Sequence, residues 1–195
     1  MPSDGAEARV AAALRAFAAR GRAVHVMVGN RDFLVGRRFL ESAHAHGLAD
    51  PTVVAAFGAR LLVSHGDLLC TRDVAYQRFR RVVRHRAVRS AFSGLPRHLR
   101  ERLGRATRAR SHGGQHHAQS DPRLDVDDGA ALAWLDALDV PRLLHGHTHR
   151  PATHALAGGR QRIVLSDWEF DQGPVRGDVL RWTAAGFERR AVAAA

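Results

Sequence analysis

The sequence predicts an α/β protein, and two observations support this. Amphipathic helical segments alternate with short runs of β-branched and aliphatic residues, and three of those runs end in Gly, Asn, Asp or His. This order is typical of a sheet covered by helices, with the functional groups in loops at strand ends. The length of 195 residues favours one domain with a sizeable core.

The chain begins with a predicted helix and strand. Residues 5–20 are rich in alanine, and their apolar side chains lie at helical spacing, which predicts an amphipathic helix ending at Gly21. The β-branched run 23–30 then predicts a strand ending in Gly-Asn. Further along, the same reasoning predicts one helix and a pair of strands joined at Gly58, over residues 37–48, 53–57 and 60–67.

The composition changes over residues 71–123. Between positions 71 and 110 there are 13 Arg, two His and only two acidic residues. Leu95-Pro96 is expected to separate two helices here, and residues 111–123 form a His-rich loop. We interpret this segment as an insertion into the α/β scaffold.

The last third of the chain predicts a helix followed by strands. The helix over 131–138 has Asp127 or Asp128 as its N-cap. A short apolar strand then leads into a His-rich loop within 141–151. Terminal strands are expected within residues 160–170 and 175–192, with turns at Gly173-Pro174 and Ala185-Gly186.

Composition narrows the classes of protein that fit. All 30 basic residues are Arg, and the net charge of +11 favours anionic partners, although an all-Arg set can also reflect genome base composition. The single cysteine, Cys70, excludes a disulfide framework and a Cys-based zinc site, and we expect it to be a small buried hydrophobe. No apolar run reaches the ~18 residues of a membrane span. The polar start does not resemble a signal peptide, so we expect a soluble or peripheral intracellular protein.

Three loops carry groups that could bind a metal: Gly29–Asp32, His65–Asp67 and His145–His149. Imidazole and amide oxygen suit borderline divalent metals such as Mn, Fe and Zn. A Gly-Asn after a strand is by itself a common turn, and His65 alone could be a hydrogen-bonded core histidine. Three His within five residues are harder to explain by packing. Together, the loops predict a metal site at the carboxyl ends of strands.

The order of these motifs resembles that of the calcineurin-like metallophosphoesterases. More narrowly, the chain resembles the UDP-2,3-diacylglucosamine diphosphatase family of lipid A synthesis in the segments GNRDFLVGRRF, LLVSHGDLLCTRDVAYQRFR and LLHGHTHRP. The resemblance runs from residue 5 onward. It implies a metallophosphoesterase sandwich of two β-sheets flanked by helices, as one domain over 1–195, with the insertion 71–123 as an Arg-rich helical cap.

The resemblance also implies a metal site. Asn30, His65 and His147 are implied as ligands of one metal and His149 as a ligand of the other, with two Mn²⁺ ions expected. No catalytic residue beyond the metal ligands is implied. His145 is expected to orient the loop.

Substrate contacts follow from the same resemblance. The implied substrate-binding residues are Asn30, Arg31, Asp73 and His147. Arg31 is expected to contact phosphate, a task that suits its planar guanidinium. Asp73 could instead be an acidic residue at a helix N-terminus. For Tyr76 and Trp168 we favour core packing.

One part of the family pattern is absent. Members carry D-x-H and then G-D ahead of the Gly-Asn motif, and this chain has neither before Asn30. We therefore expect the first two strands to be missing, together with the carboxylate that bridges the metals, so the ligand set is incomplete and activity of this chain is in question. Either Met1 is a misassigned start or a truncation, or the chain is a short, inactive relative. The retained ligands favour the first explanation, and in-frame translation of the upstream DNA would decide.

The resemblance implies hydrolysis of UDP-2,3-diacylglucosamine at the α-phosphorus, giving UMP and 2,3-diacylglucosamine 1-phosphate at the cytoplasmic face of the inner membrane. The cap could receive acyl chains and meet anionic headgroups, or its apolar residues could pack on themselves. Alternatives are an inactive paralogue that binds anionic lipid or nucleic acid, or an enzyme for another nucleotide diphosphate. Nucleic acid is disfavoured because no binding module or paired aromatics are present. The apolar residues of the cap are Val74, Phe79, Val82, Val83, Val88, Phe92, Leu95, Leu99 and Leu103.

Overall fold

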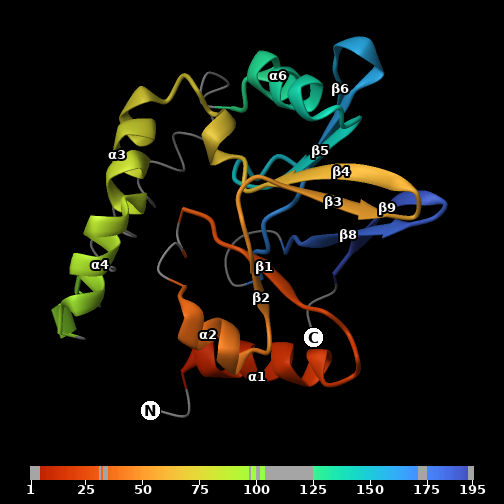
Figure 1. Ribbon diagram of the computed structural model, residues 1–195. Helices are drawn as coiled ribbons and strands as arrows, with labels where there is room; N and C mark the ends of the chain where they lie inside the picture. Colours follow the sequence, from red (N-terminus) through yellow and green to blue (C-terminus); the bar gives the residue numbers. More distant parts are fainter. Residues whose placement is uncertain are drawn as a thin grey trace. The chain divides into compact units, whose positions relative to one another are not determined.

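The computed structural model describes residues 5–30, 32, 35–96, 98–99, 102–103, 125–170 and 175–192. The chain forms two compact units, residues 1–50 and 51–195 (Figure 1). Arg31, the His-rich loop 111–123 and the expected turn at Gly173-Pro174 lie outside the described residues.

The first unit combines two helices with a two-stranded parallel sheet. Its elements are α1 (Ala6–Ala18), β1 (His25–Met27), α2 (Arg37–Ser42) and β2 (His46–Leu48). The predicted first helix and strand are confirmed. The prediction of a single helix over 37–48 is wrong in its second half, because His44 has a positive φ of 51° that ends the helical course. The next residues pair with β1, and the His46 amide donates to the Val24 carbonyl at 2.8 Å.

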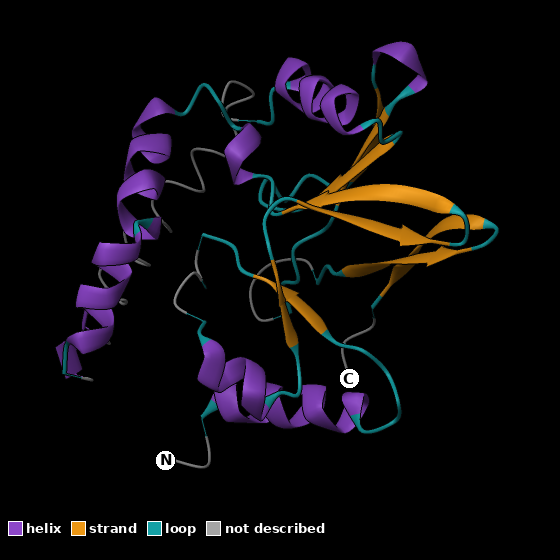
Figure 2. Ribbon diagram, in the orientation of Figure 1, coloured by secondary structure: helices purple, strands orange, loops and turns teal. Residues whose placement is uncertain are grey.

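A mixed five-stranded sheet in the order β3-β4-β5-β7-β6 forms the centre of the second unit (Figure 2). Its strands are β3 (Thr52–Ala56), β4 (Ala59–Ser64), β5 (Arg142–His145), β6 (Ala152–Ala155) and β7 (Gln161–Val164). The three inner strands run parallel, and β3 and β6 are antiparallel edges. The hairpin predicted at Gly58 is confirmed, with positive φ at both turn residues, Phe57 and Gly58. Strand β6 was not predicted, because only one residue of the short segment Ala-Thr-His-Ala has high β-propensity.

A separate hairpin ends the described chain. It consists of β8 (Asp178–Thr183) and β9 (Gly186–Ala191), which pair antiparallel across the turn predicted at Ala185-Gly186. With helices on a mixed sheet, the α/β class is confirmed.

The described helices of the second unit include α3 (Val74–Arg84), α4 (Arg86–Gly94) and α6 (Asp128–Leu138), with short 3₁₀ turns η1 (Asp67–Leu69) and η3 (Ala157–Gly159). The break predicted at Leu95-Pro96 does end α4, but an earlier break at His85 divides the basic segment first. The backbone of His85 is extended, and its side chain caps α4 by accepting from the Ala87 amide. Asp127 is the N-cap of α6. None of the described helices combines the length and apolar character that a membrane crossing requires.

Side chains from the sheet and from α6 share the main core. Cys70 is buried there, as predicted, and burial raises the pKa of its thiol to about 12. The prediction that Trp168 packs in the core is wrong, since it is 59% exposed and its indole N–H donates to the Asp178 carbonyl. The buried residues of this core are Leu62, Leu69, Cys70, Val126, Ala131, Leu135, Val140 and Leu143.

Candidate active site

Neighbouring parallel strands bring two of the predicted loops together. Ser64, the last residue of β4, lies opposite His145 at the end of β5, which in turn lies opposite Val164 at the end of β7. The loops that leave these strands therefore begin side by side at one edge of the sheet. The Gly146 amide joins two of them directly by donating to the His65 carbonyl at 3.1 Å.

Gly66 allows the closest approach between these loops. Its φ is +105°, and a Cβ added there would lie 2.8 Å from His145 Nδ1 and 3.2 Å from the Gly146 carbonyl oxygen. Only a residue without a side chain fits both the backbone conformation and the space.

Replacing Gly66 with alanine is expected to lower the free energy of unfolding by roughly 2–4 kcal/mol, combining left-handed backbone strain with steric overlap. Urea unfolding would measure the loss. Gly58→Ala is the matched control, because Gly58 has φ +72° but nothing within 4 Å of an added Cβ, so only the backbone cost of about 1 kcal/mol applies. Equal losses at the two positions would contradict the close contact at Gly66.

Two histidines face each other at this edge. The ring centroids of His65 and His147 are 5.0 Å apart, and the Tyr76 ring lies 5.7 Å from His147. His147 Nδ1 is buried and has no hydrogen-bond partner among the described residues. Burial, with the nearby charge of His65 as a smaller cause, lowers the pKa of His147 to about 3, so the ring is neutral.

The backbone of this loop is strained. Both His147 and His149 have positive φ, 68° and 55°, a conformation that costs L-residues of order 1 kcal/mol each. Such strain persists only where surrounding contacts hold it, and it concentrates at functional sites.

His145 has a defined tautomer. Its Nδ1 lies 2.8 Å from the Gly146 carbonyl, which can only accept, and its Nε2 lies 3.3 Å from Arg162 Nη1, which can only donate. The proton must therefore sit on Nδ1. Burial lowers the pKa of His145 to about 4, in agreement with a neutral ring. These contacts suit a residue that orients the loop.

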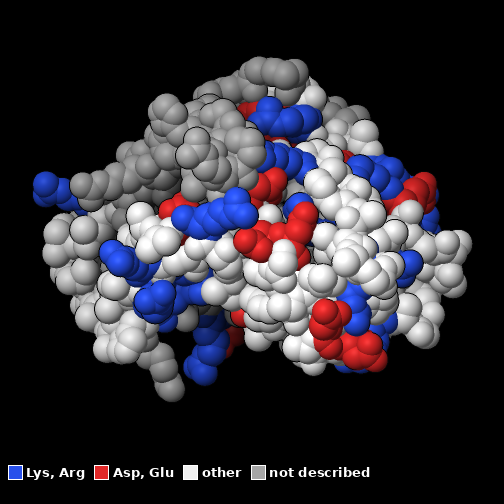
Figure 3. All heavy atoms as spheres, turned by 90° about the horizontal axis from the view of Figure 1, so that it is seen from above, with Lys and Arg blue, Asp and Glu red and all other residues white. Residues whose placement is uncertain are grey.

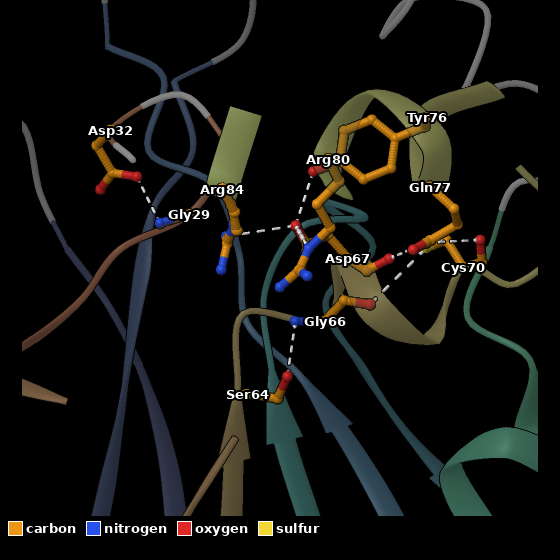
Figure 4. Close-up of polar contacts among 10 residues, drawn as sticks. All are labelled: Gly29, Asp32, Ser64, Gly66, Asp67, Cys70, Tyr76, Gln77, Arg80 and Arg84. Atoms are coloured by element: carbon orange, nitrogen blue, oxygen red, sulfur yellow. Dashed lines mark hydrogen bonds and ion pairs between the residues drawn. The ribbon is translucent and has the colours of Figure 1, made fainter. Parts of the chain in front are cut away.

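Asp67 is fully buried and fastens helix α3 to the His65 loop (Figure 4). Its Oδ2 accepts from Tyr76 Oη at 2.7 Å and Arg80 Nε at 2.8 Å, with Arg84 Nη2 at 3.5 Å. Burial alone would raise the pKa of Asp67, but the Tyr76 hydrogen bond and the charges of His65 and Arg80 outweigh it and lower that pKa. The Asp67 carboxylate is thus ionised and engaged by α3.

The remaining predicted site residues are placed as follows. Asp73 is the N-cap of α3, and its Oδ1 accepts from the Tyr76 amide at 2.9 Å, so it does serve as an acidic residue at a helix N-terminus. Asn30 follows β1 in the first unit, where the Gly29 amide donates to Asp32 Oδ1. Arg31 lies outside the described residues.

Asp167 was missed by the sequence analysis. It follows β7, and its Oδ2 lies 3.4 Å from His149 Nδ1, while Arg176 binds the carboxylate through two donors at 2.9 and 2.7 Å. The Arg176 hydrogen bond is the main cause that lowers the pKa of Asp167. The available signal was a polar Ser-Asp directly after the apolar run Ile163–Leu165, at a strand end like the other loops.

The residues of the second unit suit a metal in chemistry but do not complete its coordination. His65 and His147 offer neutral imidazoles, and the buried Nδ1 of His147 lacks a partner among the described residues. Asp67, the nearby carboxylate, is engaged by α3 through Oδ2, while its Oδ1 is buried without a hydrogen-bond partner among the described residues. In the part of the chain that the structure describes, no three His, Cys, Asp or Glu side chains are grouped to hold a metal.

Histidines and carboxylates gather at the carboxyl edge of a mixed α/β sheet, which is where α/β proteins place their functional sites. No protein-family model matches the chain. Proteins named UDP-2,3-diacylglucosamine hydrolase do match it. The Ralstonia nicotianae protein is 44% identical over 187 residues, covering 92% of this chain and 69% of that protein. The Xanthomonas campestris pv. campestris protein is 43% identical over 183 residues, covering 89% and 73%. The Pseudomonas fluorescens protein is 38% identical over 182 residues, covering 92% and 73%. The chain therefore belongs to the UDP-2,3-diacylglucosamine hydrolase family.

Among solved structures, the chain is similar to a single mutant of Vps29 from Entamoeba histolytica, with a TM-score of 0.38, 14% identity and coverage of 98% of this chain and 93% of that one.

Proposed function

We propose that the chain hydrolyses UDP-2,3-diacylglucosamine at the α-phosphorus, releasing UMP and 2,3-diacylglucosamine 1-phosphate for lipid A biosynthesis. The observation that carries the proposal is the identity of 38–44%, over about nine tenths of the chain, with proteins of that name. The paired imidazoles at the sheet edge support it, because neutral imidazoles can hold a divalent cation of the kind that stabilises the charge on a phosphoryl group.

The proposed site uses residues from three loops and from α3. We assign metal binding to Asn30, His65, His147 and His149, and substrate contact to Asn30, Arg31, Asp73 and His147. A bound divalent ion, Mn²⁺ in this proposal, would lower the pKa of water and neutralise phosphoryl oxygens. The neutral ring of His147 keeps a lone pair for such an ion, and Asp67 keeps α3, and with it Asp73, against the His65 loop.

Residues 71–123 would serve as a cap for the lipid part of the substrate. On α3, apolar side chains are exposed at Val74 (54%), Phe79 (42%) and Val82 (59%), among several arginines. We propose that such side chains contact acyl chains and that the arginines contact anionic headgroups at the cytoplasmic face of the inner membrane.

On the face seen in Figure 3, the basic side chains drawn lie among acidic ones, unlike the single-sign surface typical of nucleic-acid binding.

The test measures binding and hydrolysis of UDP-2,3-diacylglucosamine by the chain, with and without added Mn²⁺. We expect saturable binding and Mn²⁺-dependent release of UMP. Binding without UMP release would contradict catalysis by this chain but would support UDP-2,3-diacylglucosamine as its ligand. Neither binding nor release, together with salt-dependent DNA binding, would favour the non-enzymatic alternative.

A further inference from the structure

Residues 125–128, at the start of α6, contact the end of the histidine loop 145–150 directly and its beginning through Arg162. The backbone here is anchored at the start of the basic segment, where the Asp127 amide donates to the Leu69 carbonyl at 2.9 Å. The carboxylate of Asp125 lies 3.1 Å from Arg150 Nη1, at the far end of the histidine loop. This half-buried ion pair holds the end of the loop.

The beginning of the loop is held through Arg162 of β7. Its side chain is only 4% exposed, and its Nε donates to Asp128 Oδ1 at 2.8 Å. The same guanidinium directs Nη1 at Nε2 of His145, 3.3 Å away, and lies 3.9 Å from Asp125 Oδ1. An arginine this buried depends on its carboxylate partners, so Asp128 and Asp125 fix where it points.

The loop between these anchors contains the two residues with strained backbone. His147 and His149 both keep positive φ, which requires contacts that hold the flanking residues in place. The anchors at His145 and Arg150 are such contacts.

We propose that Asp125, Asp128 and Arg162 are positioning residues that act through His145 and Arg150 to hold the loop bearing His147 and His149. The catalytic consequence rests on the proposed function, but the structural consequence does not. Asp125 and Asp128 follow the basic segment 71–123 directly in the sequence, so the geometry of the histidine loop depends on where that segment ends.

The test compares carboxylates at and just before the start of α6 with one near its end. Asp128→Asn and Asp125→Asn remove charges that hold the loop. Asp136→Asn is the control. Asp136 is on α6, like Asp128, and its Oδ1 forms an ion pair with Arg160 Nε at 2.7 Å. Its side chain is 58% exposed, against 57% for Asp128. NMR-detected amide exchange is followed at Gly146 and Thr148, whose amides donate within the loop region.

We expect exchange at Gly146 and Thr148 to accelerate roughly 10-fold in Asp128→Asn and Asp125→Asn, and to match the parent in Asp136→Asn. We also expect kcat to fall roughly 10-fold with KM nearly unchanged in the first two variants only. Parent-like exchange in both loop variants would overturn the proposal. If one of them folds poorly, parent-like exchange in the other is enough to overturn it. Loss of hydrolysis in every protein, parent included, would refute the proposed function and leave the exchange result to decide this one.

Discussion

Replacing His147 with alanine is expected to lower the rate of UMP release at least about 1,000-fold without lowering the stability of the chain. The loss of activity follows if His147 holds the ion that neutralises the phosphoryl oxygens. Stability should be spared because His147 Nδ1 is buried without a hydrogen-bond partner among the described residues, and removing an unsatisfied polar atom recovers its desolvation cost. A large loss of activity with unchanged stability is the signature of a residue kept for function.

The measurement pairs single-turnover hydrolysis with thermal unfolding. His154→Ala is the control, since His154 lies on β6 of the same sheet, outside the loop, and should retain parent activity. His147→Asn separates backbone from side-chain effects, because asparagine tolerates the positive φ of 68°. Activity above a tenth of the parent value in His147→Ala would contradict a ligand role.

The sequence predicted those parts of the fold that local patterns decide. Helical spacing of apolar residues placed α1, and the two-residue turn at Phe57-Gly58 placed the β3-β4 hairpin. The His65 and His145–His149 loops were also predicted to lie together, because neighbouring parallel strands end at the same edge of a sheet.

Long-range ion pairs were not predictable in this way. Arg80 belongs to a segment with 13 arginines between positions 71 and 110, and nothing local marks it as the partner of Asp67. The same holds for Arg162, whose contacts with Asp128 and His145 depend on how α6 docks on the sheet. Strand β2 was missed because three residues of an edge pairing carry too little pattern to compete with the preceding helix.

The second large effect is expected at Asp67, where replacement by asparagine should lower the free energy of unfolding by about 3–5 kcal/mol. Asp67 is fully buried, and its carboxylate faces Arg80 and Arg84, whose side chains are 13% and 21% exposed. The substitution keeps the shape of the side chain but removes the negative charge that faces these guanidinium groups. Such a loss is a large part of the roughly 5–15 kcal/mol that stabilises a typical domain.

Urea unfolding of a double-mutant cycle with Arg80→Met would separate the pair from its surroundings. Removing both charges should cost less than Asp67→Asn alone, because the buried cation nearest to the lost carboxylate is then absent as well. Glu188→Gln is the matched control: Glu188 and Arg190 are also 2.8 Å apart, but their side chains are 53% and 51% exposed, so no measurable change is expected. If Asp67→Asn lowered the free energy of unfolding as little as Glu188→Gln, burial would not be what makes the Asp67 pair strong. Helix α3 would then be held to the His65 loop mainly by Gln77, which donates to the carbonyls of Asp67 and Cys70.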